Sequence, residues 1–311
     1  MEVVIIGLGS IGVKHLAALK EIDADIKVYA LRSRKNAPDI EGIQNLYSFE
    51  EMTNLPDFFI ISNPTMLHGS MIKKLAGYGV PMFIEKPAVH SMEECDELTS
   101  TVCQSDLLSY VGCNLRFHPC IRFIKDHINS TKPGINEVNI YCGSNLPDWR
   151  PGRDYKQSYS ANQNMGGGVH LDLFHEMDYA VWIFGHPGSH RGFTSQVSSI
   201  HIDAPDFASY LLSYPGFNIS LTLNYYRKIP KRQLEILFDN DTWTVDLTTS
   251  RIFSDKGTLI FESENFSLKD THLDQMNYFI NCVQSGQKPM NTLEDSLKIL
   301  KISLEHEPLK G

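Results

Sequence analysis

Short apolar runs alternate with amphipathic stripes along the first third of the chain. A stripe with apolar residues three or four positions apart predicts a helix, whereas the continuous run Phe-Phe-Ile-Ile-Ser at 58–62 is typical of a parallel strand buried on both faces. Strands are predicted at 3–6, 26–31, 58–62, 82–84 and 107–111, and helices at 13–21, 48–53, 68–78 and 91–104. This alternation, with short connections, predicts a doubly wound parallel sheet.

The pattern changes in the middle of the chain. Further helices are predicted at 120–128, 172–184, 271–284 and 292–305, and strands at 138–142, 217–226, 234–238 and 243–247. In 217–226 every second residue from Phe217 to Tyr225 is apolar, a period of two that marks antiparallel strands with one buried face. We therefore predict an α/β protein with two domains, a parallel-sheet domain at 1–118 and an α+β domain with an open, mainly antiparallel sheet at 119–311.

Length, charge and cysteine usage set outer bounds. A chain of 311 residues is long enough for two domains, each with its own core. Its net charge of −9 lacks the basic footprint of a nucleic-acid-binding protein, so no nucleic-acid partner is expected. The six cysteines include no C-x-x-C pair, and neither a secretory leader nor a long apolar segment occurs. We expect reduced thiols, a cytoplasmic location and no membrane partner.

Three glycines directly after the first predicted strand point to a phosphate-binding turn. The segment reads Gly7-Leu-Gly9-Ser10-Ile11-Gly12 and leads straight into a helix. In this context Gly7 permits the tight turn, Gly9 lets the backbone approach a pyrophosphate, and Gly12 lets the helix pack against the sheet. The amide groups that open the helix favour an anion. The segment therefore predicts a dinucleotide site.

Glu85-Lys86-Pro87 follows another predicted strand, at the edge of the sheet where open α/β folds place ligands. Pro87 keeps Lys86 out of helical geometry and so fixes its direction. A lysine held there can hydrogen-bond a reacting hydroxyl or carbonyl oxygen and stabilise charge in the transition state. Lys86 is therefore a candidate catalytic residue, with a solvated surface lysine as the alternative.

A second candidate constellation lies at 166–178, where three glycines precede acidic and imidazole side chains. On a helix beginning near Asp172, the side chains of Asp172, His175 and Glu176 share one face. Asp172 and His175 are candidates for proton transfer to or from a substrate oxygen. With His170 and Glu176 they could instead ligate zinc, but hydride transfer to a nicotinamide needs no metal and we expect none.

A long polar segment at 143–168 is rich in cations and aromatic rings. The residues in question are Trp149, Arg150, Arg153, Asp154, Tyr155 and Lys156. Such a segment could clamp a phosphate or carboxylate and stack a ring, or it could be a solvated basic loop, and both readings stay open. A second basic and aromatic cluster at 225–228 is predicted to be an interface or an exposed strand end.

Four motifs in order resemble the Gfo/Idh/MocA family, named for glucose–fructose oxidoreductase, inositol dehydrogenase and a rhizopine-catabolism protein. The motifs are the glycine segment with His15, Ser62-Asn63-Pro64-Thr65-Met66-Leu67-His68, Glu85-Lys86-Pro87, and the glycine-rich segment ending in Asp172-x-x-His175. The resemblance implies an N-terminal Rossmann domain and a C-terminal domain whose open sheet often forms the oligomer interface. It therefore implies a homodimer or homotetramer.

The resemblance also implies reversible oxidation of a sugar hydroxyl with NAD(P). It implies that Lys86 contacts the reacting oxygen and that Asp172 with His175 completes the catalytic group. Cofactor contacts are implied for the glycine segment and for Ser62, Asn63, Pro64, His68, Glu85 and Lys86. Asn114 and Arg116 resemble the segment that crosses between domains. The candidate substrate-binding residues are these two together with Trp149, Arg150, Arg153 and Tyr155.

Two departures from the family pattern bear on chemistry. Many members have Asp-x-x-x-His, whereas here His175 comes one residue earlier, so that Asp172 could act without it. The acidic residue expected after the second strand is replaced by Arg32-Ser33-Arg34. An aspartate there would accept a hydrogen bond from the adenosine 2′-hydroxyl, while arginine and serine suit a 2′-phosphate. The cofactor is predicted to be NAD or NADP, with a preference for NADP.

The segment 146–155 resembles family members of surface-polysaccharide and amino-sugar pathways. This suggests a sugar, sugar acid or nucleotide sugar as substrate, with Arg150 and Arg153 near its anionic group. Two other functions stay open. One is a cofactor-binding sensor or scaffold without turnover, and the other is a reductase of a non-sugar such as a linear tetrapyrrole or an imine.

Overall fold

The computed structural model describes residues 1–35 and 39–308, and the chain forms two compact units. Unit 1 comprises Met1–Asn114 and Leu268–Lys298, and unit 2 comprises Leu115–Ser267 and Ile299–Gly311. The chain therefore enters unit 2 near the predicted domain boundary but returns to unit 1 for about thirty residues near its end. This division differs from the predicted one, which assigned all of 119–311 to the second domain.

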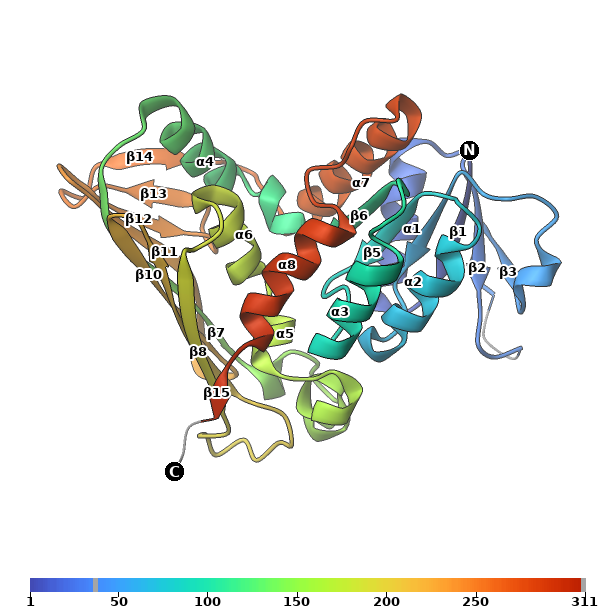
Figure 1. The fold of residues 1–311 in the computed structure, drawn as a ribbon, viewed down its shortest axis with the longest axis horizontal. Coiled ribbons are helices and arrows are strands. Elements are labelled where there is room, and N and C mark those ends of the chain that lie inside the picture. The colour runs from blue at the N-terminus through green and yellow to red at the C-terminus, as the bar shows by residue number, and fades with distance from the viewer. Residues whose placement is uncertain (36–38, 309–311) are drawn as a thin grey trace. The chain divides into compact units, whose positions relative to one another are not determined.

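Unit 1 is built on a six-stranded parallel sheet in the order β3-β2-β1-β4-β5-β6 (Figure 1). The strands are β1 (Glu2–Ile6), β2 (Lys27–Leu31), β3 (Ile43–Leu46), β4 (Phe58–Ile61), β5 (Met82–Glu85) and β6 (Ser109–Gly112). Every residue of β4, β5 and β6 is buried, as a continuous apolar run predicts for a central strand. The strand order reverses between β1 and β4, so their carboxyl ends form the switch point where such sheets bind ligands.

Helices cover both faces of this sheet, so the doubly wound architecture is confirmed (Figure 1). The helices are α1 (Ser10–Ile22), α2 (His68–Ala76), α3 (Met92–Thr101) and α7 (Leu268–Ser285). α1 packs against α7, and α2 packs against α3. Phe279 of α7 lies edge-on to Phe58 and Phe83, with ring centroids 5.2 and 5.5 Å apart. These contacts explain why a helix from the end of the chain belongs to the first unit.

Unit 2 is built on a nine-stranded sheet in the order β14-β13-β12-β11-β7-β10-β9-β8-β15 (Figure 1). The strands are β7 (Ile135–Asn145), β8 (Ser189–Ser195), β9 (Phe207–Tyr214), β10 (Phe217–Asn224), β11 (Tyr226–Phe238), β12 (Thr242–Asp246), β13 (Arg251–Phe253), β14 (Leu259–Glu262) and β15 (Glu307–Pro308). Only the β7–β10 and β8–β15 pairs are parallel among the described strands. The predicted open, mainly antiparallel sheet is confirmed.

One face of the unit 2 sheet packs against helices α4 (Pro119–Thr131), α5 (Val169–Asp172) and α6 (His175–Phe184). The single helix predicted from 172 to 184 is wrong at its start. Leu173, with ψ at 34°, breaks the helix between α5 and α6. Asp172 and His175 therefore belong to different helices, and the expected shared face with Glu176 does not form.

Two buried ion pairs hold α6 in unit 2. Arg116 donates Nε and Nη2 to the two carboxylate oxygens of Asp178 at 2.9 and 2.6 Å. Arg232 of β11 places its Nε 2.8 Å from Oε1 of Glu176, and the Glu176 side chain is fully buried. A planar guanidinium suits such paired contacts, so the orientation of α6 is set by both charges and packing.

The segment 143–168 was predicted to be a long loop, but much of it is ordered into short helical turns. β7 continues to Asn145, and 3₁₀ turns follow at Leu146–Asp148, Tyr155–Gln157, Tyr159–Ala161 and Gln163–Met165. At Gly167 a Cβ atom would lie only 2.1 Å from the carbonyl oxygen of Tyr159, so no other residue fits where this segment folds back. Within the described part of the chain, no helix is both long and apolar enough to cross a membrane.

Candidate functional site

The glycine turn after β1 is shaped by close backbone contacts with the end of β4. Gly7 has a φ of +87°, and a Cβ there would lie 2.5 Å from Cα of Asn63. A Cβ on Gly12 would lie 2.5 Å from the carbonyl oxygen of Gly7, to which Ser62 Oγ donates a hydrogen bond at 2.7 Å. Glycine at both positions is therefore required by the protein itself.

Gly9 differs from its two neighbours, because a Cβ there would meet nothing within 4 Å. It stands at the N-cap of α1, and no side chain among the described residues caps that helix end. The first amide groups of α1, from Ser10, Ile11 and Gly12, therefore point outward with the positive end of the helix dipole. Open space beside uncapped amides is what a pyrophosphate needs, so these residues fit a dinucleotide.

The carboxyl end of β2 carries the residues predicted to select the cofactor. Arg32 is half-buried and donates from Nη1 to Oδ1 of Asn45 at 3.1 Å, while Ser33 and Arg34 are exposed. Asn45 in turn donates to Asp39 at 2.7 Å. The three predicted residues thus follow the strand on the ligand side of the sheet, with Arg32 tethered to β3.

Glu85, at the end of β5, is locked in place by a histidine from α1. Nε2 of His15 lies 2.7 Å from Oε1 of Glu85, and both residues are buried. Burial opposes ionisation of Glu85, but the hydrogen bond and charge of His15 outweigh it and lower the pKa of this carboxyl. The second oxygen of Glu85 accepts from the backbone N–H of Lys86 at 3.2 Å. The backbone that carries Lys86 is therefore fixed from the glycine-turn helix.

His68 ties the predicted Ser62–His68 motif to the Glu85-Lys86-Pro87 motif. Its two ring nitrogens lie 2.8 Å from the carbonyl oxygen of Asn63 and 3.0 Å from that of Pro87. Burial lowers the pKa of His68 against the pull of these carbonyls, so the ring is neutral and donates to one of them. The Lys86–Pro87 peptide bond is cis. Ser62, Asn63, Pro64, His68, Glu85 and Lys86 thus form one connected group.

In unit 2, Asp172 is buried and is held by tyrosines rather than by a histidine on its own helix. Tyr225 Oη donates to Oδ2 of Asp172 at 2.5 Å, and the Tyr159 hydroxyl hydrogen-bonds the same carboxyl group. Tyr225 is fully buried, so the prediction of an interface or exposed strand end at this residue is wrong. The sequence did carry a signal: Tyr225 continues the inward row of β10 that includes Leu223.

A pocket of about 360 Å³ lies beside these tyrosines in unit 2. Its lining residues are Leu146, Trp149, Arg150, Arg153, Asp154, Tyr155, Gln157, Ser158 and Ser160. The Trp149 ring stands edge-on to Tyr225 at 5.3 Å, and the Arg150 guanidinium lies 5.7 Å from the centre of the Tyr159 ring. The structure thus brings together all four loop residues that the sequence singled out for substrate binding.

The remaining predicted residues lie elsewhere. Asn114 is buried and donates to Thr271 Oγ1 of α7 at 2.6 Å, and Arg116 is engaged by Asp178. His175 is half-buried at the start of α6. His170 is buried with its ring 5.5 Å from that of His306, and no group of described residues is arranged to hold a metal ion. The geometry gives Asn114 and Arg116 structural contacts.

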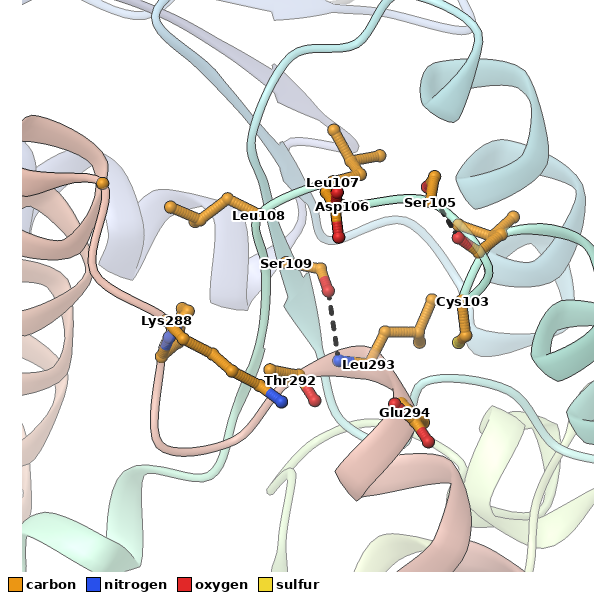
Figure 2. A pocket seen from close by; sticks show the side chains of 13 residues that line it. Cys103, Ser105, Asp106, Leu107, Leu108, Ser109, Lys288, Thr292, Leu293 and Glu294 are labelled. Atoms are coloured by element: carbon orange, nitrogen blue, oxygen red, sulfur yellow. Dashed lines mark hydrogen bonds between the residues drawn. The ribbon is translucent and has the colours of Figure 1, made fainter.

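A second pocket, of about 310 Å³, lies at the start of β6, on the side of the sheet opposite the glycine turn (Figure 2). In Figure 2 the backbone N–H of Leu293, in the first turn of α8 (Leu293–Leu304), donates to Ser109 Oγ at 3.2 Å. Parallel sheets bind their ligands at the carboxyl ends of the strands. This pocket is therefore not a candidate for the cofactor.

Comparison with known families decides the classification. Residues 1–113 match the family model of an oxidoreductase family with an NAD-binding Rossmann fold, and residues 135–252 match the GFO/IDH/MocA C-terminal domain. The chain belongs to the GFO/IDH/MocA family of oxidoreductases. The match places the family's NAD-binding domain on the glycine turn and its C-terminal domain on the sheet of unit 2.

Individual relatives are distant. An uncharacterised oxidoreductase of Bacillus subtilis is 29% identical over 191 residues, which cover 58% of this chain but only 53% of that protein. The myo-inositol 2-dehydrogenase of Thermotoga maritima is 23% identical over 328 residues, covering 95% and 92% of the two chains. Among solved structures, UDP-N-acetylglucosamine 3-dehydrogenase of Acidithiobacillus ferrooxidans shares the fold with a TM-score of 0.78 and 17% identity, covering 98% and 96%.

Proposed function

We propose that this GFO/IDH/MocA oxidoreductase transfers a hydride between a nicotinamide cofactor and a hydroxyl or ketone carbon of a sugar, sugar acid or nucleotide sugar. The observation that carries the proposal is the linked group at the carboxyl ends of β1, β4 and β5. There a glycine turn fitted to a dinucleotide is joined through His15 and Glu85 to Lys86. A protein that only bound the cofactor would have no need to fix a lysine in this way.

When bound, the nicotinamide would accept the hydride from the carbinol carbon or return it. The chain supplies the proton chemistry. We assign Lys86 the role of hydrogen-bonding the reacting oxygen, which stabilises the charge that develops on it. We assign Asp172, with His175, the role of accepting the hydroxyl proton during oxidation and returning it during reduction.

The pocket in unit 2 supports an anionic substrate. Arg150 and Arg153 place two guanidinium groups on its wall, and Trp149 and Tyr155 add flat aromatic surface. Guanidinium groups bind carboxylates and phosphates in bidentate fashion, and aromatic rings stack on sugars or bases. We propose that this pocket takes the carboxylate of an acidic sugar or the diphosphate of a nucleotide sugar.

NADP is the proposed cofactor preference, because Arg32, Ser33 and Arg34 follow β2 where an acidic residue would otherwise accept the adenosine 2′-hydroxyl. We further propose that the chain forms a homodimer or homotetramer through the sheet of unit 2 and acts in the cytoplasm. Size-exclusion chromatography with light scattering decides the assembly.

The test is a dehydrogenase screen with NAD and NADP against neutral sugars, uronic acids and nucleotide sugars. The proposal expects turnover with at least one sugar, a higher kcat/KM with NADP, and a kcat at least a hundredfold lower in Lys86→Ala with NADPH binding retained. Tight NADPH binding without turnover on any sugar would instead favour a sensor or scaffold. Turnover of an imine or tetrapyrrole alone would favour the non-sugar reductase.

A further inference from the structure

The carboxyl group of Asp172 sits in a closed network of hydroxyl groups. Tyr225 and Tyr159 both hydrogen-bond it, and the Ser160 hydroxyl hydrogen-bonds both phenols. Asp172 and Ser160 are buried, and Tyr225 is fully so. A carboxylate offers about four lone-pair sites, so two phenol donors leave room for one more proton.

The phenols can act only as donors in this network. The neighbouring Asp172 carboxylate, together with burial, raises the pKa of Tyr159. Burial, and then the same carboxylate, raises the pKa of Tyr225. Both hydroxyls therefore stay protonated, and their hydrogen bonds stabilise the ionised form of the acid they point to.

Each phenol is itself held by groups that line the pocket. Tyr225 packs against the edge of Trp149, whose Nε1 donates to Ser144 Oγ at 2.8 Å. Tyr159 lies under the guanidinium of Arg150. Trp149, Arg150 and Ser160 all line the pocket, so the wall of the pocket and the clamp on Asp172 share residues.

We propose that Tyr159 and Tyr225 are positioning residues that fix the Asp172 carboxylate as the proton acceptor, and that they connect it to the wall of the substrate pocket. This inference rests on the proposed function, because it concerns the proton step of that reaction. It assigns the orientation of Asp172 to two tyrosines from distant segments rather than to a histidine on the same helix. Positioning of this kind raises kcat because a displaced base costs about a hundredfold in rate.

The kinetic test uses the full-length protein and Tyr159→Phe and Tyr225→Phe, which keep the rings and remove only the hydroxyls. We expect kcat to fall tenfold to a hundredfold, with the KM for NADPH unchanged and the acid-side loss of activity beginning at a higher pH. Tyr210→Phe is the matched control, because Tyr210 is buried in the same sheet and donates to the carbonyl oxygen of Ser303, not to Asp172. Equal kcat values for wild type and Tyr225→Phe, or equal losses in Tyr225→Phe and Tyr210→Phe, would overturn the proposal.

A second measurement does not depend on turnover. Urea unfolding of Tyr225→Phe, Asp172→Asn and the double variant forms a cycle, in which a direct hydrogen bond to a charged group makes the effects on the unfolding constant non-multiplicative by about tenfold. The cycle with Tyr210→Phe in place of Tyr225→Phe should be multiplicative. If wild type turns over no sugar, the proposed function fails while this cycle still decides the clamp: coupling supports it, and multiplicative effects refute it.

Discussion

Nε2 of His15 lies 2.7 Å from Oε1 of Glu85, in the interior of unit 1. One partner stands on the helix that opens at the glycine turn, and the other ends the strand that leads to Lys86. This pair therefore connects the segment fitted to the cofactor phosphates with the segment proposed to carry the catalytic lysine. Its removal should affect stability and catalysis together.

Glu85→Ala leaves a buried histidine without its carboxylate and the Lys86 amide without its acceptor. We expect a loss of about 3–5 kcal/mol in the free energy of unfolding, measured by urea titration. Glu85→Gln keeps an acceptor oxygen and should lose less. Glu294→Ala, which breaks only an exposed pair with Lys298, should cost no more than about 0.5 kcal/mol. Equal costs for Glu85→Ala and Glu294→Ala would show that the buried pair does not hold this region.

Gly9→Ala and Gly12→Ala should separate binding from folding. An alanine at 12 meets the carbonyl oxygen of Gly7 at 2.5 Å, and we expect a loss of about 1–3 kcal/mol in stability. An alanine at 9 meets no protein atom within 4 Å, so stability should stay within about 0.5 kcal/mol of wild type.

The same Gly9 variant should weaken NADPH binding at least tenfold, because its methyl group would occupy the space proposed for the pyrophosphate. Fluorescence titration with NADPH measures this. If Gly9→Ala bound NADPH as tightly as wild type, the pyrophosphate would not pass over this residue.

His118 should make stability depend on pH between 6.5 and 4. Its Nδ1 accepts from the backbone N–H of Cys120 and its Nε2 donates to the carbonyl oxygen of Leu247, both at 3.2 Å, which is a pattern of the neutral ring. Burial, aided by the charge of Arg232, lowers the pKa of His118 from 6.5 to about 4. The unfolded chain takes up the proton first, so stability is full above pH 6.5 and falls towards pH 4.

The expected slope is about 1.4 kcal/mol per pH unit from this one group, read from urea titrations at pH 7, 6 and 5. His118→Asn keeps a side-chain acceptor at the N-cap of α4 but cannot titrate, so its curve should be flatter by that amount. Parallel curves for the two proteins would mean that His118 is protonated in the folded state.

Arg150→Ala/Arg153→Ala tests the proposed anionic group of the substrate. Each charge-assisted contact contributes about 1.5–3 kcal/mol, so we expect the KM for the preferred acidic sugar to rise at least tenfold and the KM for NADPH to stay unchanged. Lys156→Ala, in the same segment but outside the pocket lining, should behave as wild type. A rise of equal size in all three KM values, or none for the acidic sugar, would contradict an anion site here.

The parallel sheet of unit 1 was predictable because a buried central strand such as β4 is written as a continuous apolar run. β3 was missed because Ile43-Gln44-Asn45-Leu46 is a short edge strand with polar residues at its centre. The break at Leu173 was missed because helical spacing alone does not show where a helix stops. The cofactor-side residues could be predicted from motifs close together in sequence.

The clamp on Asp172 could not be predicted in the same way. Tyr159 and Tyr225 come from a polar segment and from the end of a strand, and only the folded sheet of unit 2 brings them to one carboxylate. The inward row of β10 predicted that Tyr225 would be buried, but the neighbouring basic residues led to the opposite expectation. Alternation along the strand was the better guide, because it reports burial directly.

Phe279 has a consequence for how the protein is made. It covers Phe58 and Phe83, yet it is joined to the chain almost two hundred residues later, after the whole sheet of unit 2 down to β14. During synthesis the nucleotide-binding sheet must wait with part of its aromatic surface bare until α7 leaves the ribosome. The half of the molecule that is started first is thus the half that is finished late, and a fragment cut at residue 118 would carry that bare surface permanently.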